Sequence, residues 1–237
     1  MTNMEECDES VEECKEFFLQ QTPQNIPEIL EGGEILDKNR YKLICQTFEN
    51  TRTFVTLYDT HNKSPVFSAA KAVNTDYDHY NQQKFDRGRL FPNSYACDLT
   101  EKISTFTLTN AVPQKSHFNR GKWNQMEKCV KRFLDENCIN NKKMEGFVVI
   151  GAKPSDSASS DSSLLNNKIN IPSVLWSAFC CYSSSQKKWL AGAHWGENRD
   201  DHHKYLETKT LGALYTTLGI EAFPGTRGPE DLTTQVY

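Results

Sequence analysis

The sequence predicts a single α+β domain built on an antiparallel sheet. Short segments rich in β-branched and aromatic residues are separated by polar turns, which is typical of antiparallel strands. One longer stretch has apolar residues at helical spacing, which indicates one prominent helix. With 237 residues the chain is long enough to bury a sizeable core, and no internal repeat or linker divides it.

The expected strands occur on both sides of the helix. The first three form a meander, a fourth follows from strict apolar–polar alternation, and three more come later in the chain. They are Tyr41–Phe48, Phe54–Tyr58, Val66–Ala70, Thr105–Thr109, Phe147–Ile150, Ser177–Tyr182 and Trp189–Ala193. The helix is expected over Asn119–Asp135, with Trp123, Met126 and Val130 on its apolar face.

Three regions differ in composition. Residues 1–40 are acidic and are expected to form an N-terminal extension that packs only in part, through Phe17 and Phe18. Residues 41–223 form the main domain. Residues 224–237, with their Pro and Gly residues, are expected to be a flexible tail.

Charge and hydropathy restrict the possible functions. The chain has 27 Lys and Arg residues against 31 Asp and Glu residues, a formal net charge of −4. It therefore lacks the bulk positive charge of many nucleic-acid binders, and any such role must rest on a local site. No apolar run reaches the roughly 18–20 residues that a membrane span needs, so no transmembrane helix is expected. The acidic start of the chain shows no apolar segment of a secretory signal.

The eight cysteines bear on the cellular compartment. They form no Cys-x-x-Cys pair, and no His lies at zinc-finger spacing from them, so a structural zinc site is not expected. Their number favours disulfides and hence an oxidising, secreted or extracellular setting. Because no leader is visible, buried free thiols in a cytoplasmic protein are the alternative.

The stretch from 86 to 127 holds the residues that could carry chemistry. On a regular helix Asn119 and Glu127 would lie about 40° either side of Trp123, because four residues advance about 400°, so their side chains would share one face. The segment Asp86–Arg89, which reads Asp-Arg-Gly-Arg, could oppose that face. An amide beside a carboxylate suits Mg²⁺, which keeps several of its waters, and arginines bind phosphate through paired hydrogen bonds.

This pattern resembles the DNA/RNA non-specific endonucleases with a ββα-metal motif, and within them the endonuclease domain-containing 1 branch of fish and other vertebrates. That family is marked by Asp-Arg-Gly-His followed by Pro, by Asn-x-x-Pro-Gln, and by an Asn, a Trp and a Glu on a helix. The residues that match in type and order are Asp86-Arg87-Gly88, Pro92, Asn110, Pro113-Gln114, Asn119, Trp123 and Glu127. The resemblance extends over roughly residues 14–222, nearly the whole chain.

The resemblance implies a central antiparallel sheet with a ββα-metal motif and flanking helices. It also implies hydrolysis of phosphodiesters in DNA or RNA with a single hydrated Mg²⁺ ion. In that case Asn119 would be the metal ligand, and Glu127 would hold a metal-bound water. Arg87 would contact the phosphate, while Asn110 and Gln114 would shape the site and bind the substrate.

The sequence departs from the family at the general base, because position 89 is Arg where the family has His. A guanidinium stays protonated and has no acceptor lone pair, so Arg89 cannot take a proton from water. Losing a general base costs about 10²–10⁴-fold in rate. Arg89 could still bind phosphate, so both an impaired endonuclease and a non-catalytic nucleic-acid-binding relative are consistent with the sequence. Lys131 stands where many relatives carry an Arg that aids the transition state.

Each candidate also has an ordinary structural explanation when taken alone. Asn119 before a helix is most often a cap, and Glu127 with Lys131 four residues later is most often an exposed pair. His117 and His79, the histidines nearest the motif, are expected on the surface rather than at the position of the base. Only the conjunction of these residues at the family spacing favours the functional interpretation.

Overall fold

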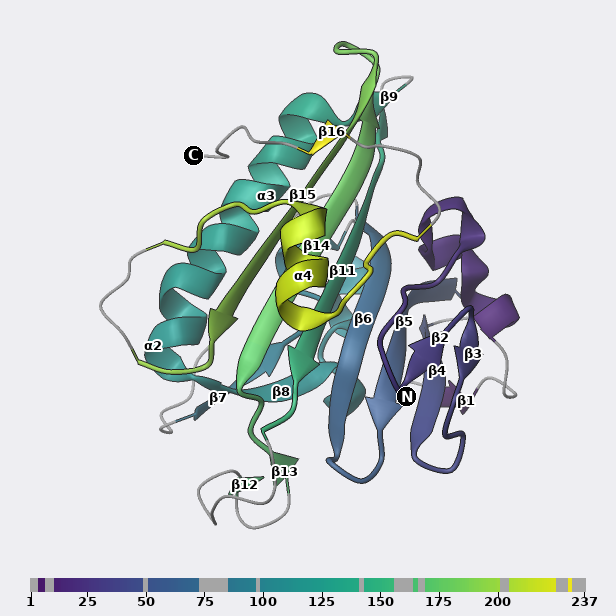
Figure 1. Cartoon of the computed structure of the whole chain (residues 1–237), viewed down its shortest axis with the longest axis vertical. Helices are drawn as coiled ribbons and strands as arrows, with labels where there is room; N and C mark the ends of the chain where they lie inside the picture. The colour runs from purple at the N-terminus through teal and green to yellow at the C-terminus, as the bar shows by residue number, and fades with distance from the viewer. Residues whose placement is uncertain are drawn as a thin grey trace.

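The computed structural model has an eight-stranded sheet at its centre (Figure 1). Each strand is antiparallel to its neighbours, except that β15 and β16 are parallel. In spatial order the strands are β1 (Met4–Glu6), β4 (Tyr41–Phe48), β5 (Thr51–Asp59), β6 (Ser64–Ala72), β11 (Gly146–Lys153), β14 (Val174–Ser183), β15 (Lys188–Glu197) and β16 (Glu230–Asp231). The structure describes residues 4–6, 11–48, 51–72, 85–96, 99–140, 143–155, 164–165, 169–200, 205–224 and 230–231.

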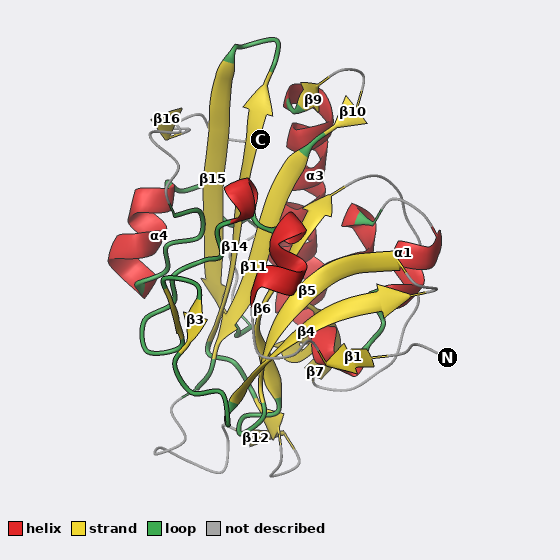
Figure 2. Cartoon of the chain, turned by 90° about the vertical axis from the view of Figure 1, so that its right-hand side faces the viewer, coloured by secondary structure: helices red, strands yellow, loops and turns green. Residues whose placement is uncertain are grey.

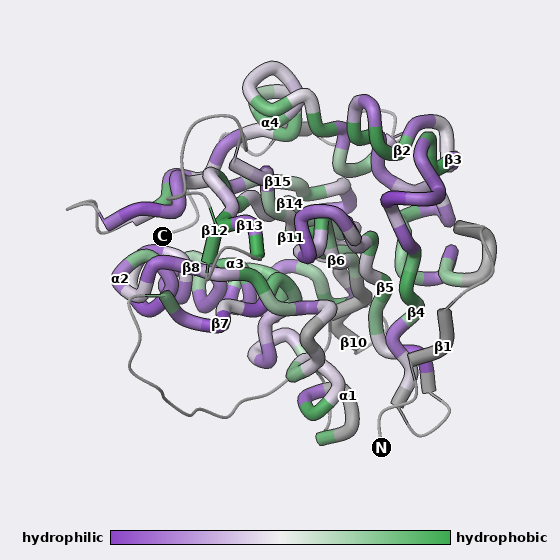
Figure 3. The backbone as a smooth tube through the Cα atoms, turned by 90° about the horizontal axis from the view of Figure 1, so that it is seen from below, coloured by the Kyte–Doolittle hydropathy of each residue, from purple (hydrophilic) through white to green (hydrophobic). Residues whose placement is uncertain are grey.

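Both faces of the sheet are covered, so the molecule has two hydrophobic cores. Successive side chains of a strand point to opposite faces, and in β14 Trp176 and Ala178 enter one core while Phe179 enters the other. The helix α4 (Leu211–Leu218) lies over the first core and α3 (Asn124–Asn137) over the second (Figures 2 and 3). This two-sided burial explains why β14 is almost continuously apolar.

The expected ββα arrangement lies on the second core. The strands β7 (Phe85–Arg89) and β8 (Ala111–Lys115) form a separate antiparallel pair. The chain then continues directly into a helical segment made of α2 (Ser116–Phe118), a π-helical turn over Asn119–Trp123, and α3. Trp123 is fully buried in the core beneath, as the sequence predicts.

The other described elements are short. They are the 3-10 helices Val11–Phe17, Leu19–Gln21, Asn93–Tyr95 and Leu108–Asn110, the helix α1 (Leu99–Ser104), and the strands β2 (Leu30–Glu31), β3 (Glu34–Ile35), β9 (Ile139–Asn140), β10 (Lys143–Met144), β12 (Leu164–Leu165) and β13 (Ile169–Asn170).

The N-terminal segment packs more extensively than its acidic composition suggests. Phe17 and Phe18 are buried as expected, and Leu30 is also buried in the first core. A disulfide joins Cys14 to Cys45 of β4. The segment is therefore held to the sheet by apolar contacts and by a covalent bond.

Most expected strands are confirmed, the first with its predicted bounds Tyr41–Phe48 and the others as parts of longer strands. The strand expected over Thr105–Thr109 is wrong, because these residues form a turn and the start of a 3-10 helix. Thr105 Oγ1 donates to the carbonyl of Lys102 (2.8 Å), and Asn110 Nδ2 donates to the carbonyl of Thr105 (3.0 Å). These local bonds satisfy backbone groups that a strand would present to a neighbour.

The principal helix is longer and less regular than predicted. Helical residues run from Ser116 to Asn137, and Asn119–Trp123 form a π-helical turn in which Gly121 has non-helical dihedral angles (φ −97°, ψ −112°). The angles derived above for a regular helix therefore do not apply to Asn119. Such π-turns inside α-helices frequently occur at functional sites.

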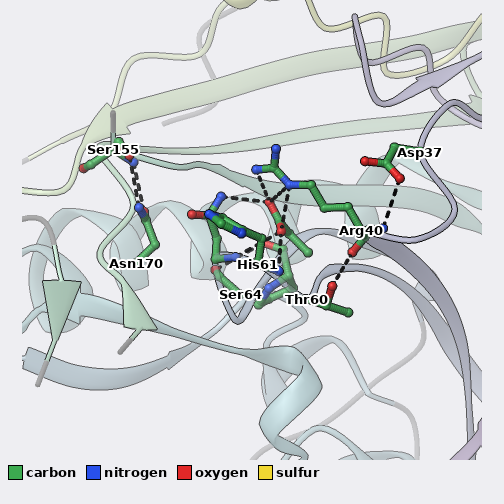
Figure 4. A network of polar contacts seen from close by, with 10 residues as sticks. Asp37, Arg40, Thr60, His61, Ser64, Ser155 and Asn170 are labelled. Atoms are coloured by element: carbon green, nitrogen blue, oxygen red, sulfur yellow. Dashed lines mark hydrogen bonds and ion pairs between the residues drawn. The ribbon is translucent and has the colours of Figure 1, made fainter. Parts of the chain in front are cut away.

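A buried carboxylate fixes the turn between β5 and β6. Asp59 accepts hydrogen bonds from Arg40 Nη2 (2.8 Å), the backbone N–H of His61 (2.9 Å) and Asn62 Nδ2 (2.8 Å). Figure 4 shows Arg40 and His61 in the polar network at this turn. Burial alone would raise the pKa of Asp59, but these bonds and the charge of Arg40 outweigh it and lower the pKa below its usual value. The ionised form of Asp59 is therefore the one that suits this turn.

Part of the C-terminal segment, which the sequence predicts to be a flexible tail, pairs with the sheet. Glu230 and Asp231 pair in parallel with Leu190 and Ala191 of β15. Most of the tail lies outside the described residues, and so does His79.

A second disulfide joins Cys138 to Cys181, and among the described cysteines Cys129 and Cys180 are free thiols. None of the described helices is both long enough and apolar enough to cross a bilayer.

Candidate functional site

The β7–β8 pair brings the Asp-Arg-Gly-Arg segment against the Pro-Gln segment. Asp86 lies opposite Gln114 and Gly88 opposite Val112. A Cβ atom on Gly88 would lie 2.2 Å from Cδ of Gln114, so only glycine fits there. Gly88 thus lets the fully buried side chain of Gln114 lie against β7. The close approach explains why these two residue types occur together.

Asp86 anchors the start of the helical segment to β7. Its carboxylate accepts hydrogen bonds from Asn119 Nδ2 (2.9 Å), Ser116 Oγ (3.0 Å) and Arg120, whose Nη2 lies 2.6 Å away. Burial raises the pKa of Asp86, but the bonds from Arg120, Asn119 and Ser116 outweigh it and lower the pKa. An ionised Asp86 therefore fixes the side chain of Asn119.

Asn119 is held with its amide oxygen available. Because Nδ2 donates to Asp86, the orientation of the amide is set. In the described part of the structure, Oδ1 of Asn119 accepts no hydrogen bond. A fixed amide oxygen suits a hard cation such as Mg²⁺, which prefers oxygen ligands. Asn119 therefore fits the role of metal ligand that the resemblance implies.

Glu127 lies two turns beyond Asn119, on α3. Although its side chain keeps some contact with solvent, burial raises the pKa of Glu127 to about 8. The positive charge of Arg89 and the indole N–H of Trp123 act in the opposite direction. Arg89 and Glu127, from β7 and α3, are thus close enough to interact electrostatically.

Arg89 ends β7 and faces an aromatic ring. Its guanidinium carbon lies 4.5 Å from the centroid of the Phe106 ring, within the range of a cation–π contact. The side chain is partly buried. The position that holds the general base in the family is therefore occupied by a cation that contacts Phe106, and its charge acts on Glu127.

Asn110 and Gln114 lie inside the protein. The side chain of Asn110 accepts hydrogen bonds from Phe91 N–H (2.9 Å) and Ser68 Oγ (3.1 Å), and it donates to the carbonyls of Phe91 and Thr105. Both polar atoms of Gln114 are buried without a hydrogen-bond partner among the described residues. All the hydrogen-bonding groups of the Asn110 amide are used inside the protein, so Asn110 holds the backbone around the site in place.

Lys131 and His117 have partners outside the centre of the site. Lys131 pairs with Asp135 on the same helix (Nζ to Oδ2, 2.8 Å), the ordinary i,i+4 arrangement, rather than with Glu127. The side chain of His117 is 88% exposed, and its Nδ1 lies 3.4 Å from Asp200. His117 is therefore a surface residue, as expected.

Two contributors were missed in the sequence. Arg120 makes a two-nitrogen contact with Asp86, and its position next to Asn119 was the available signal. Phe106, which contacts Arg89, was assigned to a strand, yet it lies in a turn with 61% of its surface exposed. Because these residues form a turn instead of a strand, no neighbouring strand among the described residues covers the side chain of Phe106.

The sequence profile of the DNA/RNA non-specific endonuclease family matches residues 56–213. The chain belongs to this family. Among curated proteins it is similar to the endonuclease domain-containing 1 proteins of Homo sapiens (25% identical over 215 residues) and Mus musculus (26% over 213 residues). Both alignments cover 71% of this chain, but only 39% and 38% of the relatives. The chain thus spans about two fifths of the length of these relatives.

A solved structure supports the fold. A chain of the crystal structure of the EndoG/EndoGI complex aligns with a TM-score of 0.54 at 17% identity, covering 73% of this chain and 84% of that one. At this identity the similarity concerns the fold alone. The α+β architecture with a large antiparallel sheet, expected from the sequence, is therefore confirmed for this member of the endonuclease family.

Proposed function

We propose that this chain binds nucleic-acid phosphodiesters at the β7–β8–helix site and that its Mg²⁺-dependent hydrolysis is impaired. The observation that carries the proposal is Arg89, a cation against the Phe106 ring at the position of the family's general base. The other residues between Asp86 and Glu127 that match the family motifs are all present.

Substrate binding would rest on local charge. Arg87 is exposed on β7, two residues before Arg89, so the two side chains project to the same side of the strand. Arginine binds phosphate through paired hydrogen bonds. Two arginines on one side of a short strand are enough for contact with a phosphodiester, although the whole chain is acidic. DNA and RNA share this group, so both are candidate substrates.

The residues present fit a single hydrated Mg²⁺ ion. Asn119 Oδ1 would be the protein ligand, and the Glu127 carboxylate would hold a water of the ion. A bound Mg²⁺ ion supplies Lewis-acid stabilisation of charge on the scissile phosphate. Asp86 keeps the Asn119 amide oriented through its hydrogen bond. Lys131, one turn after Glu127, is the remaining candidate for contact with developing negative charge.

Hydrolysis also requires a group that removes a proton from the attacking water. Arg89 cannot do this, since a guanidinium carries no acceptor lone pair. We expect the rate to be lower than that of a relative with His by about 10²–10⁴-fold. We therefore expect proton transfer from the attacking water to be slowed and the binding of nucleic acid to be unaffected.

Cleavage of plasmid DNA and of RNA in Mg²⁺ tests this proposal, with the wild type beside Arg89→His. We expect slow cutting by the wild type and an increase of at least about 10²-fold in Arg89→His, abolished by EDTA. The variant Arg89→His with Asn119→Ala is the matched control and should cut no faster than the wild type. Fast, EDTA-sensitive cutting by the wild type would contradict the impaired-base proposal.

A non-catalytic nucleic-acid-binding protein is the second candidate. It is favoured by the same Arg89, which adds a positive charge at the point where the family has a base. Binding of DNA or RNA by the wild type and by Arg89→His in a gel-shift assay, with no cleavage by Arg89→His, would favour this candidate.

The two disulfides support a secreted or extracellular protein, since disulfides persist in oxidising compartments.

A further inference from the structure

The surface next to Arg89 is unusually apolar. The helix α1 and the turn after it expose Leu99 (72%), Ile103 (43%) and Phe106 (61%). Leu99 and Ile103 are four residues apart on one helix face, and the N–H of Phe106 donates to the carbonyl of Ile103 (3.1 Å). Exposed apolar groups gathered in this way commonly mark a binding surface.

Arg89 joins this apolar surface to the candidate phosphate site. Its guanidinium covers one face of the Phe106 ring, while most of the ring stays open to solvent. Arg87 projects on the same side of β7 and is exposed. An aromatic ring thus lies beside two arginines on a single short strand. This is the chemistry that a nucleotide matches, with a flat apolar base and an anionic phosphate.

We propose that Phe106, with Arg89 against one face of its ring, is a stacking platform for an unpaired base. The site would then prefer single-stranded nucleic acid. This rests on the proposed function, because the phosphate of the same nucleotide would contact Arg87. In a blunt duplex the bases are stacked and paired inside the helix, and presenting one to Phe106 requires unstacking. The charge of the two arginines favours nucleic acid over an apolar protein segment as the occupant.

Fluorescence anisotropy with the full chain in EDTA tests the platform without cleavage. The probes are an oligothymidylate, an abasic oligonucleotide of the same length and a blunt duplex. We expect Phe106→Ala to weaken oligothymidylate binding between about fivefold and 100-fold, because stacking on an aromatic side chain contributes about that much per base. Binding of the abasic strand and the duplex should change by less than about twofold, and Phe106→Trp should retain oligothymidylate binding.

Tyr215→Ala is the matched control. Tyr215 is 60% exposed on α4, which lies on the other side of the sheet from α1 (Figure 3), and its loss should leave all three affinities unchanged. If the wild type binds duplex and single strand equally, or if Phe106→Ala leaves oligothymidylate binding unchanged, the platform is wrong. The second outcome would assign the apolar surface to a protein partner. Equal binding of all three probes with no effect of Phe106 would leave the proposed function standing, whereas no binding of any probe would remove both.

Discussion

Two carboxylates of the site, Asp86 and Glu127, are driven in opposite directions by their surroundings. Asp86 receives hydrogen bonds from three side chains, and they lower its pKa despite burial. Burial raises the pKa of Glu127 to about 8, with only partial opposition from Arg89 and Trp123. Asp86 therefore favours its charged form and anchors Asn119 through a hydrogen bond. Glu127 is the residue whose charge depends on what binds beside it.

Asp59 offers a test of the same physics away from the candidate site. Its pKa is lowered below the usual value of 3.8, so ionisation of Asp59 contributes stability above that pH and the contribution is lost as the pH falls further. We expect Asp59→Asn to lower the free energy of unfolding by about 2 kcal/mol at pH 7, since it removes hydrogen bonds to a charged acceptor. Urea unfolding from pH 7 down to pH 3 measures this difference.

The difference between wild type and Asp59→Asn should shrink as the pH falls below about 4, because the unfolded state of the wild type then takes up a proton first. Glu34→Gln, a change at an exposed carboxylate on β3, is the control and should leave the free energy of unfolding as in the wild type from pH 7 to pH 3. A difference that stays constant down to pH 3 would show that Asp59 acts by packing rather than by charge.

At the scale of elements, periodic patterns were predictable and local hydrogen bonding was not. The strand Tyr41–Phe48 and the helix around Trp123 follow from the spacing of apolar residues. The segment Thr105–Thr109 has an alternation typical of strands, but the side-chain amide of Asn110 donates a hydrogen bond to the carbonyl of Thr105. The π-helical turn at Asn119 also has no signature in apolar spacing. The candidate site was found through its motif residues, whereas Phe106 and Arg120 required the fold.

Asn110 is expected to hold the segment before α1 in place. Its amide oxygen accepts the hydrogen bond of the Phe91 N–H, while the N–H of Leu90 donates to the backbone carbonyl of Asn110. We expect Asn110→Ala to lower the free energy of unfolding by about 2–4 kcal/mol, because several buried partners lose their bonds. Hydrogen exchange should become faster at Phe91 than at Leu90, whose partner the substitution retains. Equal changes at the two amides would contradict this local role.

For the whole molecule, net charge and family membership point in different directions. The formal charge of −4 argues against a nucleic-acid surface, yet the family profile covers more than half of the chain. The cations that we propose for phosphate binding, Arg87 and Arg89, lie on one strand of five residues. The proposed phosphate binding therefore rests on a small part of the surface that average composition does not represent.

The two disulfides join distant parts of the chain and should contribute much of its stability. Cys138 directly follows α3, the helix that carries Glu127, and bonds to Cys181 of β14 across 43 positions, while Cys14 and Cys45 are 31 apart. Closing loops of this length restricts the unfolded chain, so we expect Cys138→Ala with Cys181→Ala to lower the free energy of unfolding by about 2–4 kcal/mol. Denaturant unfolding at pH 7 measures this loss. Cys129→Ala, at a free thiol, should change stability by less than about 0.5 kcal/mol. If the paired variant unfolds like the wild type, the fold does not depend on an oxidising compartment, and the argument for a secreted protein loses its physical basis.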